Sequence, residues 1–209
     1  MPGQVSFAYY RMEPVWFAVA LINTTGTVGH DADPLADTSA AQVFLGGHEF
    51  PGEVSEADLV VLRELRSELC TVFAAADDLS AAARTNGLLD RYSAPPRIVH
   101  DVEQGLHLHF ERPQQDFGRW VAAVTVMGIA FVLCEYGSER MGICALPHCG
   151  NAFIDSSKNR SKRYCAAGHA HQASTAAFRS RRRTRSAQAG PVFDRTTTDP
   201  VSEGREGAE

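Results

Sequence analysis

The chain has 209 residues, enough for one medium domain or two small ones, and its hydrophobic content of 44% is that of a globular protein. The N-terminus lacks a basic segment followed by a long apolar stretch, so no secretory signal is expected. The longest apolar run, residues 120–134, is too short for a comfortable membrane span and predicts a buried core helix. We therefore expect a cytoplasmic protein without a membrane partner, in which clustered cysteines indicate metal rather than disulfides.

Charge is distributed unevenly along the chain. Residues 144–186 contain nine Lys and Arg against one acid, Asp155, so this segment carries +8. Because the whole chain carries −5, the remainder carries −13. The split indicates a basic contact module attached to an acidic body, although a basic helix that is merely well solvated has the same composition.

The first half of the chain predicts a strand and a long helix. Residues 15–25 are rich in β-branched and aromatic side chains and precede a glycine, which predicts a buried strand. Pro and Gly signals over residues 30–54 predict loops with one short element. Ser55 and Asp58 resemble a capping box, and a leucine stripe at helical spacing follows to about residue 76.

The second half predicts further helices around a hairpin. A short helix is expected at residues 79–89, then a hairpin turning at 103–105, then a long helix at 116–136 that Gly137 ends. This gives an α+β body over residues 1–137. The polar, Pro- and Gly-rich tail, 187–209, predicts disorder.

Three of the five cysteines lie in the basic segment, beside three histidines. Structural zinc takes four Cys or His ligands, usually as two sequence-local pairs. Cys144 and Cys149 form one pair, and Cys165 begins a second in a segment with helical character. Unrelated thiols and solvent-facing histidines are the alternative, which the pairing makes improbable.

Helical geometry selects the fourth ligand. On a helix His169 lies about 40° around the axis from Cys165, whereas His171 lies about 120° away. His148 adjoins Cys149 and would strain to bind the same ion. The expected site is one structural Zn²⁺ held by Cys144, Cys149, Cys165 and His169.

Other cysteines and histidines have simpler explanations. Cys70 and Cys134 lie on predicted helix stripes without partners and are interpreted as buried core thiols. His107 and His109 alternate along a strand, with His100 nearby, and are interpreted as a wet or semi-buried sheet face rather than a second metal site.

The loop between the cysteine pairs predicts a small zinc module. Phe153 and Ile154 supply apolar side chains, and Asp155 can accept backbone or arginine hydrogen bonds in a turn. A knuckle, a hairpin and a helix that donates the last two ligands would make a treble-clef-like zinc finger, over residues 138–186.

The finger resembles a known family. The pattern C144-x4-C149-x3-F153-x-D155-x-S157-x2-R160-x2-R163-x-C165 is similar to that of the CGNR zinc-finger proteins, bacterial stress-induced transcription regulators whose N-terminal part is the ABATE domain. The upstream order, with L21-I-N23-T24 near the start, also fits. One departure stands out: the family's Cys-Gly-Asn-Arg at the fourth ligand is replaced here by residues 169–172, His-Ala-His-Gln. Histidine preserves zinc binding in principle, but contacts of the family's Asn and Arg are not carried over.

The resemblance implies a bacterial, stress-responsive transcription regulator that binds double-stranded DNA. Such a protein would be associated with the nucleoid when it is bound to DNA. The residues expected to contact DNA are the basic side chains of the loop and helix and two polar helix residues that could reach base edges. They are Lys158, Arg160, Lys162, Arg163, Gln172, Thr175, Arg179, Arg181, Arg182, Arg183 and Arg185. The alternative is a zinc-stapled adaptor that binds RNA or protein.

Catalysis is not expected, because four protein ligands fill the zinc tetrahedron and leave no open position. The resemblance suggests that the body senses a signal through a small-molecule effector. Its negative charge could mask the finger, or the body could join two fingers in a homodimer, and the sequence leaves both open.

Overall fold

The computed structural model describes residues 7–25, 32–102, 105–110, 112 and 115–188. Within these residues the chain forms α-helices and two small antiparallel sheets, which confirms the α+β class. The chain divides into two compact units, 1–170 and 171–209, which are treated separately below. The elements are α1 (Phe7–Asn23), α2 (Thr38–Gly46), α3 (Glu56–Phe73), α4 (Asp78–Tyr92), β1 (Arg97–Asp101), β2 (Gly105–His109), α5 (Phe117–Tyr136), the 3₁₀ turn η1 (Ser138–Arg140), β3 (Met141–Ile143), β4 (Ala152–Ile154) and α6 (Ala167–Gln188).

The strand expected at residues 15–25 is wrong, because residues 15–23 belong to helix α1 and residues 24–25 form a turn after it. Val15, Phe17 and Ala18 are fully or almost fully buried, as are Leu21 and Ile22 one turn later. A helix that is apolar around most of its circumference has no polar stripe to reveal the 3.6-residue period. A short apolar run of this kind cannot be assigned to helix or strand from its pattern alone.

The predicted start of α3 is confirmed in atomic detail. The Ser55 side chain accepts a hydrogen bond from the Asp58 N–H at 3.2 Å, and the Asp58 carboxylate accepts from the Ser55 N–H at 2.9 Å. Aspartate therefore completes the capping box in place of the longer glutamate. The loop region before it holds α2, and the expected short helix at 79–89 is α4.

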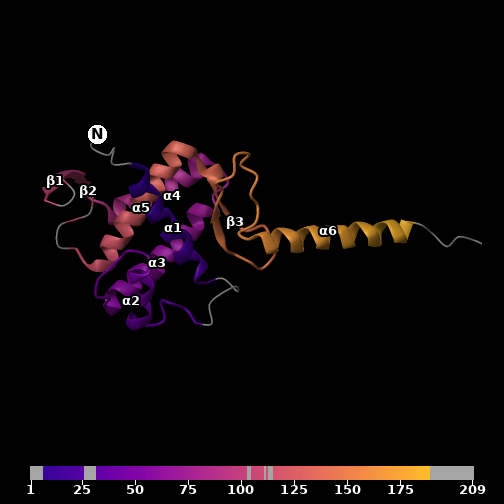
Figure 1. The fold of residues 1–209 in the computed structure, drawn as a ribbon, viewed down its shortest axis with the longest axis horizontal. Helices are drawn as coiled ribbons and strands as arrows, with labels where there is room; N and C mark the ends of the chain where they lie inside the picture. The colour runs from indigo at the N-terminus through magenta and orange to yellow at the C-terminus, as the bar shows by residue number, and fades with distance from the viewer. Residues whose placement is uncertain (1–6, 26–31, 103–104, 111, 113–114, 189–209) are drawn as a thin grey trace, which may run out of the picture. The chain divides into compact units, whose positions relative to one another are not determined.

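Helix α5 packs against α1, α3 and α4 (Figure 1). It is long and apolar enough to cross a membrane by length and composition, but half of that stretch is buried among the other helices. The close approach of α3 requires a glycine: a Cβ at Gly118 would lie 2.9 Å from the Asp58 Cα. Helix α5 is therefore the core helix that its apolar run predicts.

The expected hairpin is formed by β1 and β2, which pair antiparallel from Arg97 opposite His109 to Asp101 opposite Gly105. The turn residues Glu103 and Gln104 lie outside the described residues.

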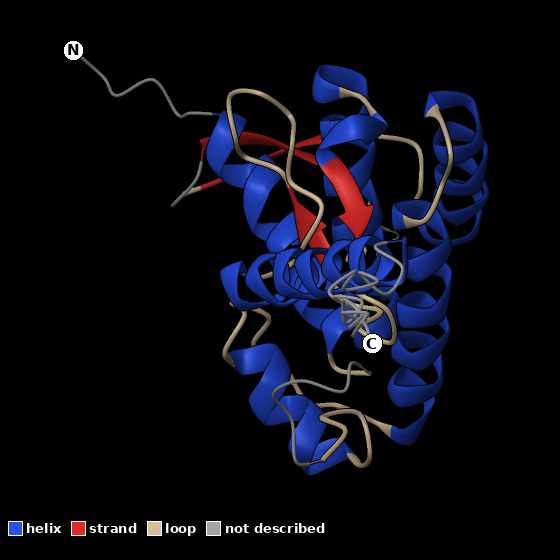
Figure 2. Ribbon diagram, turned by 90° about the vertical axis from the view of Figure 1, so that its right-hand side faces the viewer, coloured by secondary structure: helices blue, strands red, loops and turns tan. Residues whose placement is uncertain are grey.

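The hairpin of the finger region is formed by β3 and β4, with Met141 opposite Ile154 and Ile143 opposite Ala152. Figure 2 shows these short strands among the helices that make up most of the molecule. The cysteine pair 144/149 lies in the turn of this hairpin, whereas we expected the hairpin between the two ligand pairs. Met141, Ala152 and Ile154 are buried in the same hydrophobic core as α1, α3 and α5.

Candidate metal centre

The first two candidate ligands lie in the turn that joins β3 to β4. The Cys144 N–H donates to the Asn151 carbonyl at 2.8 Å, and the Cys149 N–H donates to the Leu146 carbonyl at 3.2 Å. Gly150 has a φ of 68°, a conformation in which glycine carries no steric cost. This tight turn brings two buried cysteines to the same end of the hairpin.

The other two candidates lie at the start of α6. Cys165 precedes the helix, and His169 lies in its first turn, where its N–H donates to the Ala166 carbonyl at 3.1 Å. The Ala145 N–H donates to the Arg163 carbonyl at 2.8 Å and so ties the loop before α6 to the turn that carries Cys144. The backbone thus brings the two pairs together.

The four donor atoms form a cluster in which every pair lies within 4.8 Å. The Cys149 and Cys165 sulfurs are 3.7 Å apart. His169 Nδ1 lies 3.2 Å from the Cys165 sulfur, 3.4 Å from that of Cys149 and 3.6 Å from that of Cys144. A tetrahedral zinc ion implies sulfur–sulfur edges of about 3.8 Å and sulfur–nitrogen edges of about 3.6 Å. The donor set and its spacing are consistent with one structural zinc ion.

The thiols influence one another in a way that favours a cation. Burial raises the pKa of Cys144, but hydrogen bonds from the backbone of Cys165 and Leu146 and from the side chains of His169 and Cys149 outweigh it and lower the pKa to about 7. Burial and the neighbouring Cys144 and Cys149 raise the pKa of Cys165 to about 12. Three thiolates this close repel one another, and a bound Zn²⁺ would relieve that repulsion.

The remaining histidines and cysteines lie elsewhere. Within the described residues, the Cys₃His group is the one cluster suited to a metal, and it contains neither His148 nor His171. Cys70 is half-buried against the core, and burial raises the pKa of its thiol, as expected of a core cysteine. Cys134, however, is exposed, so its interpretation as a core thiol is wrong: it falls on the solvent side of α5.

Two of the three hairpin histidines, His100 and His109, lie on different faces of the sheet. His100 lies opposite Leu106 and His109 lies opposite Arg97, so these two occupy opposite faces of the two-stranded sheet. The side chain of His107 lies outside the described residues.

Asp155 organises the loop that follows β4, as expected. It is 1% exposed, and its carboxylate accepts hydrogen bonds from the N–H groups of Ser157 and Lys162, both at 2.8 Å. A hydrogen bond with the Ser157 side chain is the largest of the effects that lower the pKa of Asp155, and the two backbone bonds lower it further. The loop is therefore held in one shape around a buried carboxylate.

The four basic residues of this loop are not equivalent. All are exposed, but Arg160 forms an ion pair with Glu139 at 2.8 Å, and the Lys162 ammonium donates to the Ile154 carbonyl at 3.1 Å. Lys162 also lies over the ring of Phe153, 5.3 Å from its centroid. The sequence predicted all four as residues that contact DNA, whereas Lys162 also has a structural role in the loop.

The second unit contains the rest of α6. From residue 171 the described side chains are exposed or half-exposed, and the segment 171–188 has five arginines and no acid. Gln172 is exposed and Thr175 is half-exposed. The five exposed arginines are Arg179, Arg181, Arg182, Arg183 and Arg185.

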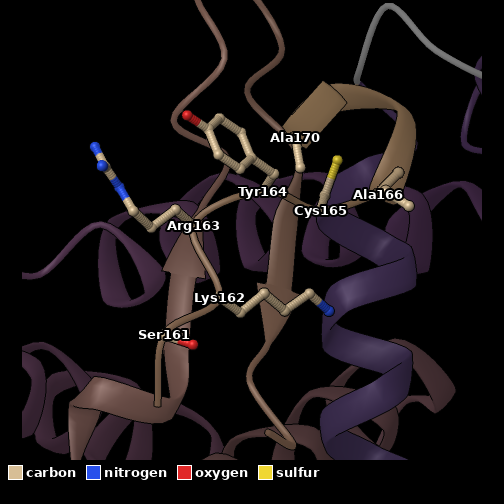
Figure 3. A pocket seen from close by; sticks show the side chains of 8 residues that line it. Ser161, Lys162, Arg163, Tyr164, Cys165, Ala166 and Ala170 are labelled. Atoms are coloured by element: carbon tan, nitrogen blue, oxygen red, sulfur yellow. The ribbon is translucent and has the colours of Figure 1, made fainter. Parts of the chain in front are cut away.

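A pocket of about 370 Å³ lies beside the start of α6 and is lined by residues 161–167 and Ala170. Figure 3 shows that Lys162 and Arg163 extend to opposite sides, while the wall near α6 consists of small alanines. The two cations therefore do not converge on one ligand.

Sequence reasoning missed two residues that support the site. Arg140 donates to the carbonyls of Asp155 and Ser157, and Asn23, far away in the sequence, hydrogen-bonds to Ala152. No short-range pattern marks either residue. The nearest signal was Asn23 within the L21-I-N23-T24 resemblance.

Comparison with known families agrees with this geometry. Residues 17–136 match the ABATE family model, described as "Putative stress-induced transcription regulator", and residues 140–182 match that of the CGNR zinc finger. No curated protein matches the chain. The first match alone covers more than half of the chain, and the second contains all four clustered ligands. The chain belongs to the ABATE family and carries a C-terminal CGNR zinc finger with histidine as its fourth candidate ligand.

Proposed function

We propose that this zinc-binding protein is a DNA-binding transcription regulator that presents the arginines of α6 to the phosphates of duplex DNA. The observation that carries the proposal is the composition of α6 from residue 171: five exposed arginines, no acid and no buried side chain among the described residues. A helix without an apolar face gains little from packing. A polyanion would stabilise it through each phosphate contact.

The arrangement of the arginines on the helix supports contact with a broad backbone surface. Arg179, Arg182 and Arg183 share one face at i, i+3 and i+4, while Arg181 and Arg185 form a second stripe. Lys158 and Arg163 of the preceding loop add exposed positive charge. Such contacts supply affinity that is independent of sequence and sensitive to salt. Gln172 and Thr175 are the residues we propose for base edges.

The role we assign to the zinc is structural. Four protein donors at tetrahedral spacing leave no position for a substrate or an activated water, so we infer that the protein is not an enzyme. Cys144, Cys149, Cys165 and His169 would hold the ion and fix the start of α6. A knuckle in a hairpin turn, followed by one ligand just before a helix and one in its first turn, is the arrangement that we assign to a treble clef.

For the body we propose a regulatory role. The family description suggests a stress response, and a small-molecule effector bound to the body is our proposal for the signal. The acidic remainder of the chain could compete with DNA for the finger, or the body could pair two chains in a homodimer. Either fits a cytoplasmic protein that associates with the bacterial nucleoid.

The test is a titration of duplex DNA with the full-length protein. We expect Arg179, Arg182 and Arg183 changed together to Gln to weaken binding about 100-fold at low salt. The slope of log K against log salt should fall by about 2.7, because each lost phosphate contact contributes about 0.9. The matched control changes Arg84, Arg97 and Arg119 to Gln, which removes the same charge from exposed positions outside the finger.

Three outcomes would contradict the proposal. Equal losses in the two triple variants would mean that only net charge matters. Tighter binding of single-stranded RNA than of duplex DNA of the same length would favour the RNA-binding adaptor. Unchanged binding to both nucleic acids, with zinc retained, would favour a protein partner.

A further inference from the structure

Asn23, the last residue of α1, is joined to the finger hairpin by two hydrogen bonds. Its side-chain Nδ2 donates to the Ala152 carbonyl at 3.2 Å, and its Oδ1 accepts from the Ala152 N–H at 2.7 Å. One carboxamide thus satisfies both polar groups of one residue, 129 positions away in the sequence. Ala152 is 1% exposed, so water is a poor substitute for these bonds.

Ala152 lies next to the metal centre. Ala152 pairs with Ile143, the last residue of β3, and Ile143 is followed directly by Cys144. The carbonyl of its neighbour Asn151 accepts the hydrogen bond from the Cys144 N–H at 2.8 Å. Whatever fixes the Ala152 main chain therefore also fixes the turn that carries Cys144 and Cys149.

We propose that Asn23 is a positioning residue for the zinc site and couples the ABATE body to the metal. It does not touch the ion, and it acts through the main chain of β4 on the orientation of Cys144. Groups that orient metal ligands from a distance contribute to affinity, because a ligand that is already placed loses less freedom on binding. The inference rests on the zinc site and is independent of DNA binding.

The coupling continues into the body through the neighbouring residue. The Thr24 hydroxyl donates to the Leu21 carbonyl at 2.8 Å and accepts from Arg66 at 2.7 Å. Arg66 in α3 also binds the Asp33 carboxylate, at 2.7 and 3.0 Å. Arg66 in α3 is thus hydrogen-bonded to Thr24, and the adjacent residue Asn23 is hydrogen-bonded to Ala152 in β4, so the end of α1 connects α3 to β4. Because coupling is reciprocal, zinc binding also stabilises this part of the body.

The side chain at position 23 must meet a specific requirement. It has to donate to a carbonyl and accept from an N–H of the same residue, which a carboxamide of this length does. Aspartate keeps the acceptor but loses the donor, and alanine loses both. The three side chains therefore form a graded series.

The test compares zinc affinity and thermal stability in Asn23→Ala, Asn23→Asp and a control. Zinc affinity is measured on the full chain by competition with a chromophoric chelator, and the melting temperature is measured with zinc and after chelation. The control is Ser55→Ala, which removes the α3 cap and destabilises the body.

We expect Asn23→Ala to lower zinc affinity about tenfold and to shrink the rise in melting temperature that zinc produces. Asn23→Asp should fall between wild type and alanine, although its added negative charge by itself would attract Zn²⁺. Ser55→Ala should lower both melting temperatures equally and leave zinc affinity within about twofold.

The proposal is overturned if Asn23→Ala binds zinc as tightly as Ser55→Ala while losing similar stability. It is also overturned if Asn23→Asp binds zinc as tightly as wild type. Should Asn23→Ala fail to fold, the comparison of Asn23→Asp with Ser55→Ala decides the question.

Discussion

Helices α5 and α6 have similar lengths, 20 and 22 residues, and opposite relations to solvent. Helix α5 buries nine residues against three other helices, whereas α6 has no buried residue among those described. The comparison shows two ways to stabilise a helix in one chain. Burial of apolar side chains stabilises α5. Helix α6 lacks such burial, so its stability depends on the groups that hold its first turn in place and on the partner that binds its charged side chains.

The two helices also begin differently. No side chain caps α5 at Asp116, but Asp58 of α3 accepts a hydrogen bond from the Gly118 N–H at 2.7 Å. In α6 the corresponding anchor is the metal centre, through Cys165 and His169. A buried carboxylate holds the start of one helix, and a candidate zinc ion holds the start of the other.

Loss of the metal should have the largest effect, and it should fall on α6. We expect the purified protein to hold one zinc, and His169→Ala, Cys144→Ser, Cys149→Ser and Cys165→Ser each to lose it. Structural zinc contributes on the order of 10 kcal/mol in isolated fingers. Metal analysis measures the stoichiometry. Far-UV circular dichroism should show that the helical signal of α6 is lost, while the larger helical signal of the body remains.

The matched control for the metal ligands is His171→Ala, two residues further along the same helix and exposed. It should retain zinc. Zinc that survives His169→Ala and disappears in His171→Ala would reverse our choice of ligand.

Removal of a buried side chain from α5 should have the next largest effect. Ile129 is fully buried, so Ile129→Ala should lower the free energy of unfolding by about 3–4 kcal/mol, from lost burial and the cavity left behind. The counterpart in α6 is Phe178→Ala, whose ring is 60% exposed and whose loss should cost less than about 0.5 kcal/mol. Urea unfolding measures both, and equal costs would show that α6 has a buried partner.

Loss of the carboxylate anchor of α5 should have a smaller effect than loss of Ile129, and this effect should depend on pH. Burial raises the pKa of Asp58, but hydrogen bonds from Ser55 and Gly118 outweigh it and lower the pKa below 3.8. The stabilisation by the ionised form is therefore complete above the unfolded-state pKa and is lost as pH falls through the lower folded-state pKa. Asp58→Asn should cost about 1–2 kcal/mol at pH 7.

The cost of Asp58→Asn should shrink as the pH falls from 3.8 through the lower folded-state pKa, because the wild-type carboxyl then becomes protonated in the folded protein as well. Thermal unfolding at pH 7 and at low pH measures the difference. A cost that is the same at every pH would mean that the charge of Asp58 contributes nothing to anchoring α5.

The sequence predicted best those features that depend on neighbours along the chain. The capping box at Ser55, the long helix ending at Gly137 and the four clustered ligands all follow from local spacing. The helical angle that distinguishes His169 from His171 is likewise a local property. Such features could be derived before any contact between distant segments was known.

Tertiary structure decided the features that depend on distant partners. Residues 15–23 are helical and are packed into the core as part of α1. A short apolar run has the same pattern whether it is buried as a helix or as a strand. Cys134 is exposed because α5 turns that position toward solvent. The bond between Asn23 and Ala152 joins residues 129 positions apart, and only the packing of β4 against the end of α1 brings their polar groups within hydrogen-bond distance.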